Sequence, residues 1–140
     1  MQSSGNIGGR PVIRPSYAEA RRSFDWASVI RDLGWDRDDS INIGRTIVDR
    51  HAVEHKVALY SIAKDGHLTV TTYRQLRRQS NQIANLLRSL GVRKGDRVAG
   101  LLSRRPETVA IMIGVWKAGG IYVPLFTGFA ADAIRQRLQS

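Results

Sequence analysis

The sequence has 140 residues, with 22 Lys and Arg and 12 Asp and Glu side chains, a formal net charge of +10. This length supports one domain with a real core and not two. The positive charge excludes an acidic tail and points to an anionic partner, such as nucleic acid, a membrane surface or a phosphorylated ligand. The absence of cysteine excludes a disulfide scaffold and thiol catalysis, and is compatible with the cytoplasmic location that we expect.

The charge is unevenly placed along the chain. Residues 1–72 carry 10 basic and 9 acidic side chains, whereas residues 73–140 carry 12 basic and 3 acidic ones. Eighteen of the basic residues are Arg, whose planar guanidinium suits phosphates and carboxylates.

Residues 1–40 are predicted to form an extension punctuated by Pro11, Pro15 and several glycines. Within it, residues 24–35 predict a short amphipathic helix that docks aromatic side chains, followed by a polar loop over residues 36–40. The opening residues contain no apolar run typical of a signal peptide. The second segment, residues 41–140, is predicted to be a partial N-terminal subdomain of a larger fold.

The second segment is predicted to begin with a helix and a hairpin. Residues 44–54 favour a helix with Ile47 and Val48 inward. Residues 57–62 and 67–71 predict two strands joined by a turn in which Gly66 adopts a positive φ.

The clearest predicted element is a helix that begins after Thr72. Gln75 completes a capping box with Thr72, and Gly91 follows the last turn. The residues predicted on its apolar face are Leu76, Ile83, Leu86, Leu87 and Leu90. Those on its opposite face are Arg74, Arg77, Arg78, Asn81, Asn85 and Arg88.

The C-terminal part is predicted to contain a βαβ unit. Apolar strands over residues 97–102 and 121–124 flank a buried helix over residues 106–117, and this arrangement predicts parallel, right-handed pairing. A final helix is predicted over residues 132–140. The apolar stretch 108–131 does not predict a membrane span, because Lys117 would cost roughly 3 kcal/mol at the bilayer centre and glycines break the stretch.

Short motifs give no complete catalytic or metal site. His51, Glu54 and His55 match the inverted zincin pattern H-x-x-E-H, which requires both imidazoles on one helical face; a pair of solvated histidines is the competing interpretation. Gly114 and Gly119 imitate the start of a phosphate-binding loop but end a helix instead of opening one. The helix face formed by Arg74, Arg77, Arg78 and Arg88 could bind the phosphates of a nucleic acid. Few aromatic residues and no sequence signature of a nucleic-acid-binding fold accompany it.

From about residue 42 onward, the chain resembles the N-terminal part of AMP-forming acyl-CoA synthetases, members of the adenylate-forming superfamily. The resemblance rests on Thr-Thr-Tyr-Arg-Gln-Leu at 71–76, with Gln75 where Glu is usual. It also rests on Gly-Val-Arg-Lys-Gly-Asp-Arg-Val at 91–98 and Lys-Ala-Gly-Gly-Ile-Tyr-Val-Pro-Leu at 117–125. Residues 126–129, residues 132–138 and the upstream Asp49-Arg50-His51 are most similar to the acetyl- and medium-chain acyl-CoA branch.

The resemblance implies an α/β fold, with a β-hairpin plus βαβ units and helices packed on a partly parallel sheet. It implies a ligase that joins a carboxylate to CoA through an acyl-adenylate, with ATP, Mg and CoA as cofactors and substrates. Residues matching Phe126, Thr127 and Gly128 lie at the CoA nucleotide site of acetyl-CoA synthetases, although Thr127 departs from the usual Gly. A loop packed for shape is the competing interpretation.

Four functional motifs of the family have no counterpart in the 140 residues. They are the phosphate loop, the Thr-Glu that contacts Mg, the Asp that binds the ribose and the catalytic Lys. We therefore expect the chain to be inactive alone and marginally folded, whether it is a broken gene product or one part of a split enzyme whose remainder is a separate chain. Two alternatives remain open: a basic nucleic-acid-binding module that uses the Arg74, Arg77, Arg78 and Arg88 face, and a noncatalytic interaction protein.

Overall fold

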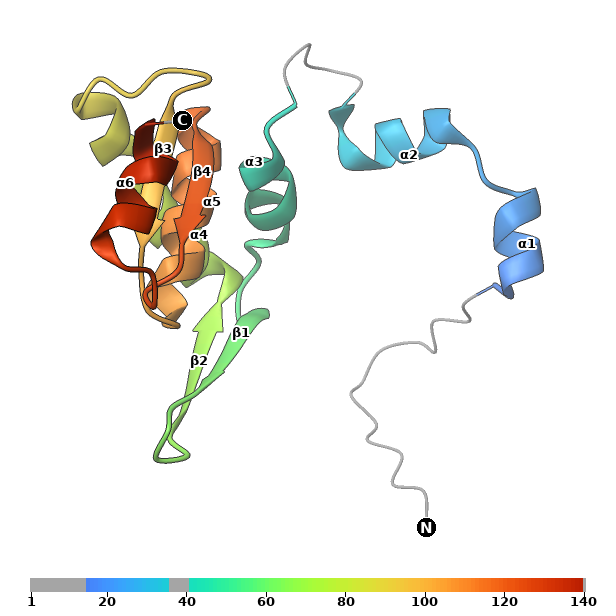
Figure 1. The fold of residues 1–140 in the computed structure, drawn as a ribbon. Helices are drawn as coiled ribbons and strands as arrows, with labels where there is room; N and C mark the ends of the chain where they lie inside the picture. The colour runs from blue at the N-terminus through green and yellow to red at the C-terminus, as the bar shows by residue number, and fades with distance from the viewer. Residues whose placement is uncertain (1–14, 36–40, 140) are drawn as a thin grey trace. The chain divides into compact units, whose positions relative to one another are not determined.

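A computed structural model describes residues 15–35 and 41–139, and the chain divides into two compact units, Met1–Asp39 and Ser40–Ser140 (Figure 1). In the first unit, helix α1 (Tyr17–Arg22) precedes helix α2 (Trp26–Leu33). The predicted amphipathic helix corresponds to α2, which begins at the N-cap Asp25. Within its own unit Trp26 is 68% exposed and meets the Phe24 ring edge to face, and the expected docking of these aromatic side chains stays a prediction.

Helix α1 was not predicted, although the sequence carries its signal. Ser16 and Glu19 form a capping box in which the Ser16 hydroxyl accepts from the Glu19 N–H and the Glu19 carboxylate accepts from the Ser16 N–H. The predicted polar loop at 36–40 lies outside the described residues.

The second unit begins with helix α3 (Ile43–Val48) and a short 3-10 helix, η2 (Asp49–His51). The predicted helix over residues 44–54 is therefore too long, because the chain leaves helical geometry after His51 and reaches a positive φ of 61° at His55. This turn directs the chain into the hairpin that follows. Val48 is buried as predicted, but Ile47 is 39% exposed.

The hairpin is confirmed as an antiparallel pair of strands, β1 (Val57–Ile62) and β2 (Leu68–Thr72). Leu59 pairs with Thr71 and Ile62 with Leu68, with an irregularity near Val57. Gly66 has the predicted positive φ, 84°.

Helix α4 (Tyr73–Ser89) follows β2 directly and has the predicted capping box between Thr72 and Gln75. Its inward face differs from the prediction. Ser80 and Ala84 are buried beside Leu76, whereas Leu86 and Leu90 are 53% and 71% exposed. Small residues occupy this face because α5 packs closely against it.

The predicted βαβ unit is also confirmed. Strands β3 (Arg97–Leu101) and β4 (Ile121–Leu125) pair in parallel, with Arg97 beside Ile121 and Leu101 beside Leu125. Helix α5 (Pro106–Ala118) connects them, and helix α6 (Ala131–Gln139) follows. The mixed fold is thus α/β, with one antiparallel and one parallel pair of strands.

The core of this unit lies between α3, α4 and α5. Val48, Leu76, Ala110 and Ile113 form its buried cluster, and the close approach of α4 and α5 requires a glycine. A Cβ at Gly114 would lie 2.5 Å from Cγ2 of Ile83 and 3.0 Å from the Ser80 carbonyl oxygen. No helix among the described residues is both long and apolar enough to cross a membrane.

Candidate functional site

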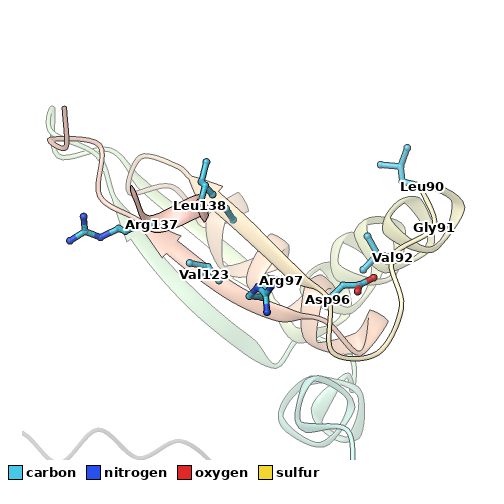
Figure 2. A pocket seen from close by; sticks show the side chains of 9 residues that line it. Leu90, Gly91, Val92, Asp96, Arg97, Val123, Arg137 and Leu138 are labelled. Carbon is cyan, nitrogen blue, oxygen red and sulfur yellow. The ribbon is translucent and has the colours of Figure 1, made fainter. Parts of the chain in front are cut away.

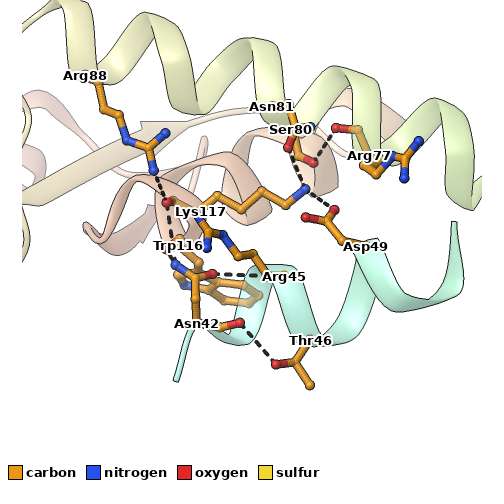
Figure 3. Close-up of polar contacts among 10 residues, drawn as sticks. All are labelled: Asn42, Arg45, Thr46, Asp49, Arg77, Ser80, Asn81, Arg88, Trp116 and Lys117. Atoms are coloured by element: carbon orange, nitrogen blue, oxygen red, sulfur yellow. Dashed lines mark hydrogen bonds and ion pairs between the residues drawn. The ribbon is translucent and has the colours of Figure 1, made fainter. Parts of the chain in front are cut away.

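The C-terminal end of α5 carries a buried ion pair. The Lys117 side chain is 4% exposed, and its Nζ lies 2.5 Å from Oδ1 of Asp49, whose side chain is 33% exposed. Nζ also donates to Oδ1 of Asn81 on α4 at 2.8 Å. Three elements therefore supply this cluster, η2, α4 and α5 (Figure 3). A buried ammonium is tolerated only with such partners, since an isolated buried charge is strongly unfavourable.

The carbonyl groups at the end of α5 are satisfied by side chains from other helices. Arg88 Nη2 donates to the Lys117 carbonyl at 2.6 Å, and Asn42 Nδ2 donates to the Trp116 carbonyl at 2.9 Å. Asn42 is also the N-cap of α3, because its Oδ1 accepts from the Arg45 N–H at 3.2 Å. One amide thus caps two helix ends, which otherwise leave backbone groups unpaired.

A polar cavity of about 490 Å³ lies beside this cluster. Its lining comes from α3, η2, α4 and α5 and consists of Arg45, Asp49, Asn81, Ala84, Asn85, Arg88 and Lys117. The prediction placed Asn81, Asn85 and Arg88 on a face opposite the apolar one. All three are exposed and line this cavity, and Asn81 and Arg88 donate to or accept from Lys117.

The predicted CoA-site residues Phe126, Thr127 and Gly128 form the exposed loop that follows β4. The rings of Phe126 and Phe129 meet edge to face with centroids 5.6 Å apart. The guanidinium of Arg137 on α6 lies 4.1 Å from the centre of the Phe129 ring. Phe129 therefore contacts both Phe126 in the loop and Arg137 on α6, and it connects the loop to this helix.

A second cavity, of about 630 Å³, lies over one face of the parallel strands (Figure 2). Arg97, Ala99 and Val123 from the strands contribute to it, together with Arg137 and Leu138 from α6. The segment between α4 and β3 completes the lining with Leu90, Gly91, Val92 and Asp96. Its mixed apolar and charged walls lie beside the same α6 that contacts the loop.

The residues of the inverted zincin pattern do not lie on one helical face, because the chain leaves helical geometry between His51 and His55. Only His51 lies in a helical turn, and no group of three or more His, Asp or Glu side chains within residues 15–35 and 41–139 is placed to hold a metal ion. Glu54 instead forms an ion pair with Arg74 at 2.9 Å. His51 lies beside the Tyr73 ring, and its Nδ1 is 3.1 Å from Nζ of Lys56. Desolvation, followed by the charges of Lys56 and Arg50, lowers the pKa of His51.

The predicted arginine face of α4 does not act as one surface. Arg74 is paired with Glu54, and Arg88 donates to the end of α5. Arg77 and Arg78 remain exposed on the helix. The face is therefore divided between an ion pair, a structural contact and two solvated side chains.

The sequence reasoning missed the partnership of Lys117, Asp49 and Asn81. Asp49 and Lys117 are 68 positions apart, so no local pattern links them. One signal was available: Lys117 is the single charge in the apolar stretch 108–131, and such a charge must find a buried counter-charge or reach solvent.

This parallel βαβ unit and the helices packed beside it have the architecture of the N-terminal part of an acyl-CoA synthetase. Among solved structures, the Brucella canis acyl-CoA synthetase matches with a TM-score of 0.77 and 43% identity, covering 88% of this chain and 23% of that one. The acetoacetyl-CoA synthetase from Streptomyces lividans matches with a TM-score of 0.58 and 31% identity, covering 64% of this chain and 15% of that one.

Sequence comparison agrees with the structural match. The acetyl-coenzyme A synthetase of Bacillus subtilis is 38% identical over 130 residues, covering 89% of this chain and 22% of the relative. That of Chromobacterium violaceum is 40% identical over 107 residues, covering 75% and 16%. The sequence profile of the AMP-binding enzyme family matches residues 48–140. The chain therefore belongs to the AMP-binding enzyme family, whose AMP-forming acyl-CoA synthetases it resembles. It spans about a fifth of the length of the curated relatives that it matches.

Proposed function

We propose that this chain is the N-terminal segment of an ATP-dependent acid–CoA ligase, which converts a carboxylate, ATP and CoA into acyl-CoA, AMP and pyrophosphate. The observation that carries the proposal is the β3–α5–β4 unit with its flanking helices, which matches an acyl-CoA synthetase at a TM-score of 0.77. The family match over residues 48–140 supports it.

Within that ligase, we assign Phe126, Thr127 and Gly128 to the rim of the CoA nucleotide site. Two features support this assignment. The loop follows the carboxyl end of a parallel strand, where ligands of open α/β sheets bind. The Phe126 ring is also 62% exposed and available for stacking on a base.

The 140 residues by themselves are expected to lack adenylation activity. The chain contains no Lys-Gly phosphate loop, and its buried lysine, Lys117, is held by Asp49 and Asn81 as a structural group. Binding of ATP, Mg and CoA would therefore require segments of the ligase other than the residues described. Those segments would lie on the same or on a separate polypeptide.

Carboxylate-dependent exchange of labelled pyrophosphate into ATP tests this proposal. We expect no exchange above background when the purified 140-residue chain is given acetate or a medium-chain acid. Exchange should appear when a polypeptide carrying the family's phosphate loop and catalytic lysine is added. A Phe126→Ala chain in that mixture should then raise the KM for CoA while leaving the exchange reaction, which needs no CoA, unchanged.

Two results would contradict the proposal. Acetate-dependent exchange by the chain alone would show that the absent motifs are not needed. Failure of any added family polypeptide to restore exchange, while it binds the chain, would favour a noncatalytic interaction protein.

A further inference from the structure

The polar cavity beside Lys117 is built by three cations and one carboxylate. Arg45 comes from α3, Arg88 from α4 and Lys117 from α5, whereas Asp49 is the single acid in the lining. The cavity therefore has an excess of two positive charges. Figure 3 shows Arg88 reaching the main-chain carbonyl of Lys117 from α4, and Arg45 lying beside Lys117 from α3.

Several donors around this cavity are not used by the protein. Lys117 donates two of its three N–H groups, to Asp49 and Asn81. Arg88 gives one of its five donors to the Lys117 carbonyl. Among the described residues, no side chain or carbonyl accepts from the Arg45 guanidinium.

The amide of Asn81 adds a further donor of fixed direction. Its Oδ1 accepts from the Lys117 ammonium, so its Nδ2 group is left to donate. Asn85, one turn later on α4, lines the same cavity. The lining thus offers guanidinium, ammonium and amide donors and only one negatively charged acceptor.

We propose that this cavity binds a phosphate group, either free phosphate or a small phosphate monoester. A dianion matches the excess of two positive charges, and guanidinium groups suit the tetrahedral oxygens of phosphate. The volume of about 490 Å³ is larger than a phosphate ion and leaves room for a small ester substituent. The proposal stands independently of the ligase function, because it concerns neither residues 126–128 nor adenylation.

Phosphate-dependent stabilisation tests the proposal. Thermal unfolding of the 140-residue chain should be followed by circular dichroism in inorganic phosphate, in glycerol 3-phosphate and in chloride, all at one ionic strength. Both phosphates should raise the midpoint relative to chloride, because a ligand that binds only the folded state stabilises it. Equal affinities would identify free phosphate as the source, and tighter binding of the monoester would identify an ester.

Arg45→Gln is the most informative variant, because the guanidinium of Arg45 makes no hydrogen bond within the described residues and its loss should leave the fold intact. Its Kd for phosphate, measured by titration calorimetry, should be about tenfold or more weaker than that of the unaltered chain. Arg88→Gln should weaken phosphate binding similarly but should also lower stability in chloride, because it uncaps α5.

Arg78→Gln is the matched control: it removes the same charge at an exposed position outside the cavity, on α4, the helix that carries Arg88. It should keep the affinity for phosphate. The proposal is overturned if neither phosphate raises the midpoint above that in chloride, if no cooperative transition occurs at any phosphate concentration, or if Arg45→Gln and Arg78→Gln weaken binding equally.

Discussion

At the scale of single residues, the ion pair between Asp49 and Lys117 is unequal in its exposure. Lys117 is almost completely buried, whereas one third of the Asp49 side chain is exposed. Removing the acid leaves a buried ammonium with an amide as its remaining partner, but removing the lysine leaves a carboxylate that solvent can reach. The two partners should therefore differ in the cost of their loss.

We predict that Asp49→Ala lowers the free energy of unfolding by about 3 kcal/mol, the lower end of the range for breaking a buried pair. Lys117→Met should cost less, because its aliphatic chain fills the same space. Urea denaturation followed by circular dichroism measures both changes. The exposed pair of Asp132 and Arg135 provides the control, since Asp132→Ala should change stability by less than about 1 kcal/mol. Equal costs for the two pair variants would contradict the asymmetry.

His51 should make stability depend on pH. Its pKa in the folded chain is lowered, chiefly by desolvation and then by the charges of Lys56 and Arg50. The folded state therefore favours neutral His51. Its contribution is present above the pKa of the unfolded state, about 6.5, and is lost as the pH falls through the lower folded pKa.

The corresponding prediction is a smaller loss of stability in His51→Gln than in the unaltered chain when the pH falls from 7.5 to about 5. Urea midpoints at the two pH values measure it. His67→Gln, which replaces a histidine in the hairpin turn, is the control. A His51→Gln chain whose midpoint falls as far as that of the unaltered chain would show that His51 is not the responsible group.

At the scale of secondary-structure elements, the contact between α4 and α5 depends on Gly114. A methyl group there would meet both the Ile83 side chain and the Ser80 carbonyl, and the carbonyl belongs to the helix backbone and moves little. The two helices would have to separate, which would disturb the core cluster around Ile113.

We predict that Gly114→Ala destabilises the chain by about 1–3 kcal/mol, despite the higher helix propensity of alanine. Combining it with Ile83→Val should restore none of the loss, because valine keeps the Cβ and the γ-methyl group that the added methyl would meet, and the Ser80 contact also remains. Denaturant unfolding of the single and double variants provides the measurement. A Gly114→Ala chain more stable than the original, as helix propensity alone predicts, would show that the helices can separate at no cost.

The sequence predicted elements wherever the signals are local. Thr72, Gln75 and Gly91 delimit α4 by capping rules, and the turn at Gly66 locates the hairpin. The helix predicted over residues 44–54 is too long, because the chain turns at His55 with a positive φ, and no Gly or Asn in the sequence indicates that turn. The polar cluster could not be predicted, since Asn42, Asp49 and Asn81 meet Lys117 and its helix end only after the tertiary fold is formed. The roles of Phe126, Thr127 and Gly128 remain predictions.

At the scale of the whole molecule, the structure shows which of the basic side chains behind the net charge of +10 have partners within the protein. Arg74 and Arg88 are engaged within the second unit, by Glu54 and by the end of α5. Arg77 and Arg78 remain for an external partner on this helix face. A nucleic acid contacted by two side chains gains few released counterions.

We therefore predict weak and sequence-independent binding to DNA or RNA, which weakens about tenfold between about 50 and 200 mM salt. Electrophoretic mobility shifts at both salt concentrations measure it, and Arg77→Gln with Arg78→Gln should remove what binding there is. A shift that persists at the higher salt concentration would favour the nucleic-acid-binding alternative over the ligase segment.

The double role of Asn42 has a consequence for which substitutions the chain can accept. Asn and Asp are interchangeable at most helix N-caps, because either side chain offers an oxygen to the first turn. At position 42 the second atom of the amide must donate to the Trp116 carbonyl, 74 residues further on. An aspartate would keep the cap of α3 but direct an oxygen at an oxygen at the end of α5. The residue that can occupy the N-cap of α3 is thus determined by the hydrogen bond that it must donate to the C-terminal end of α5.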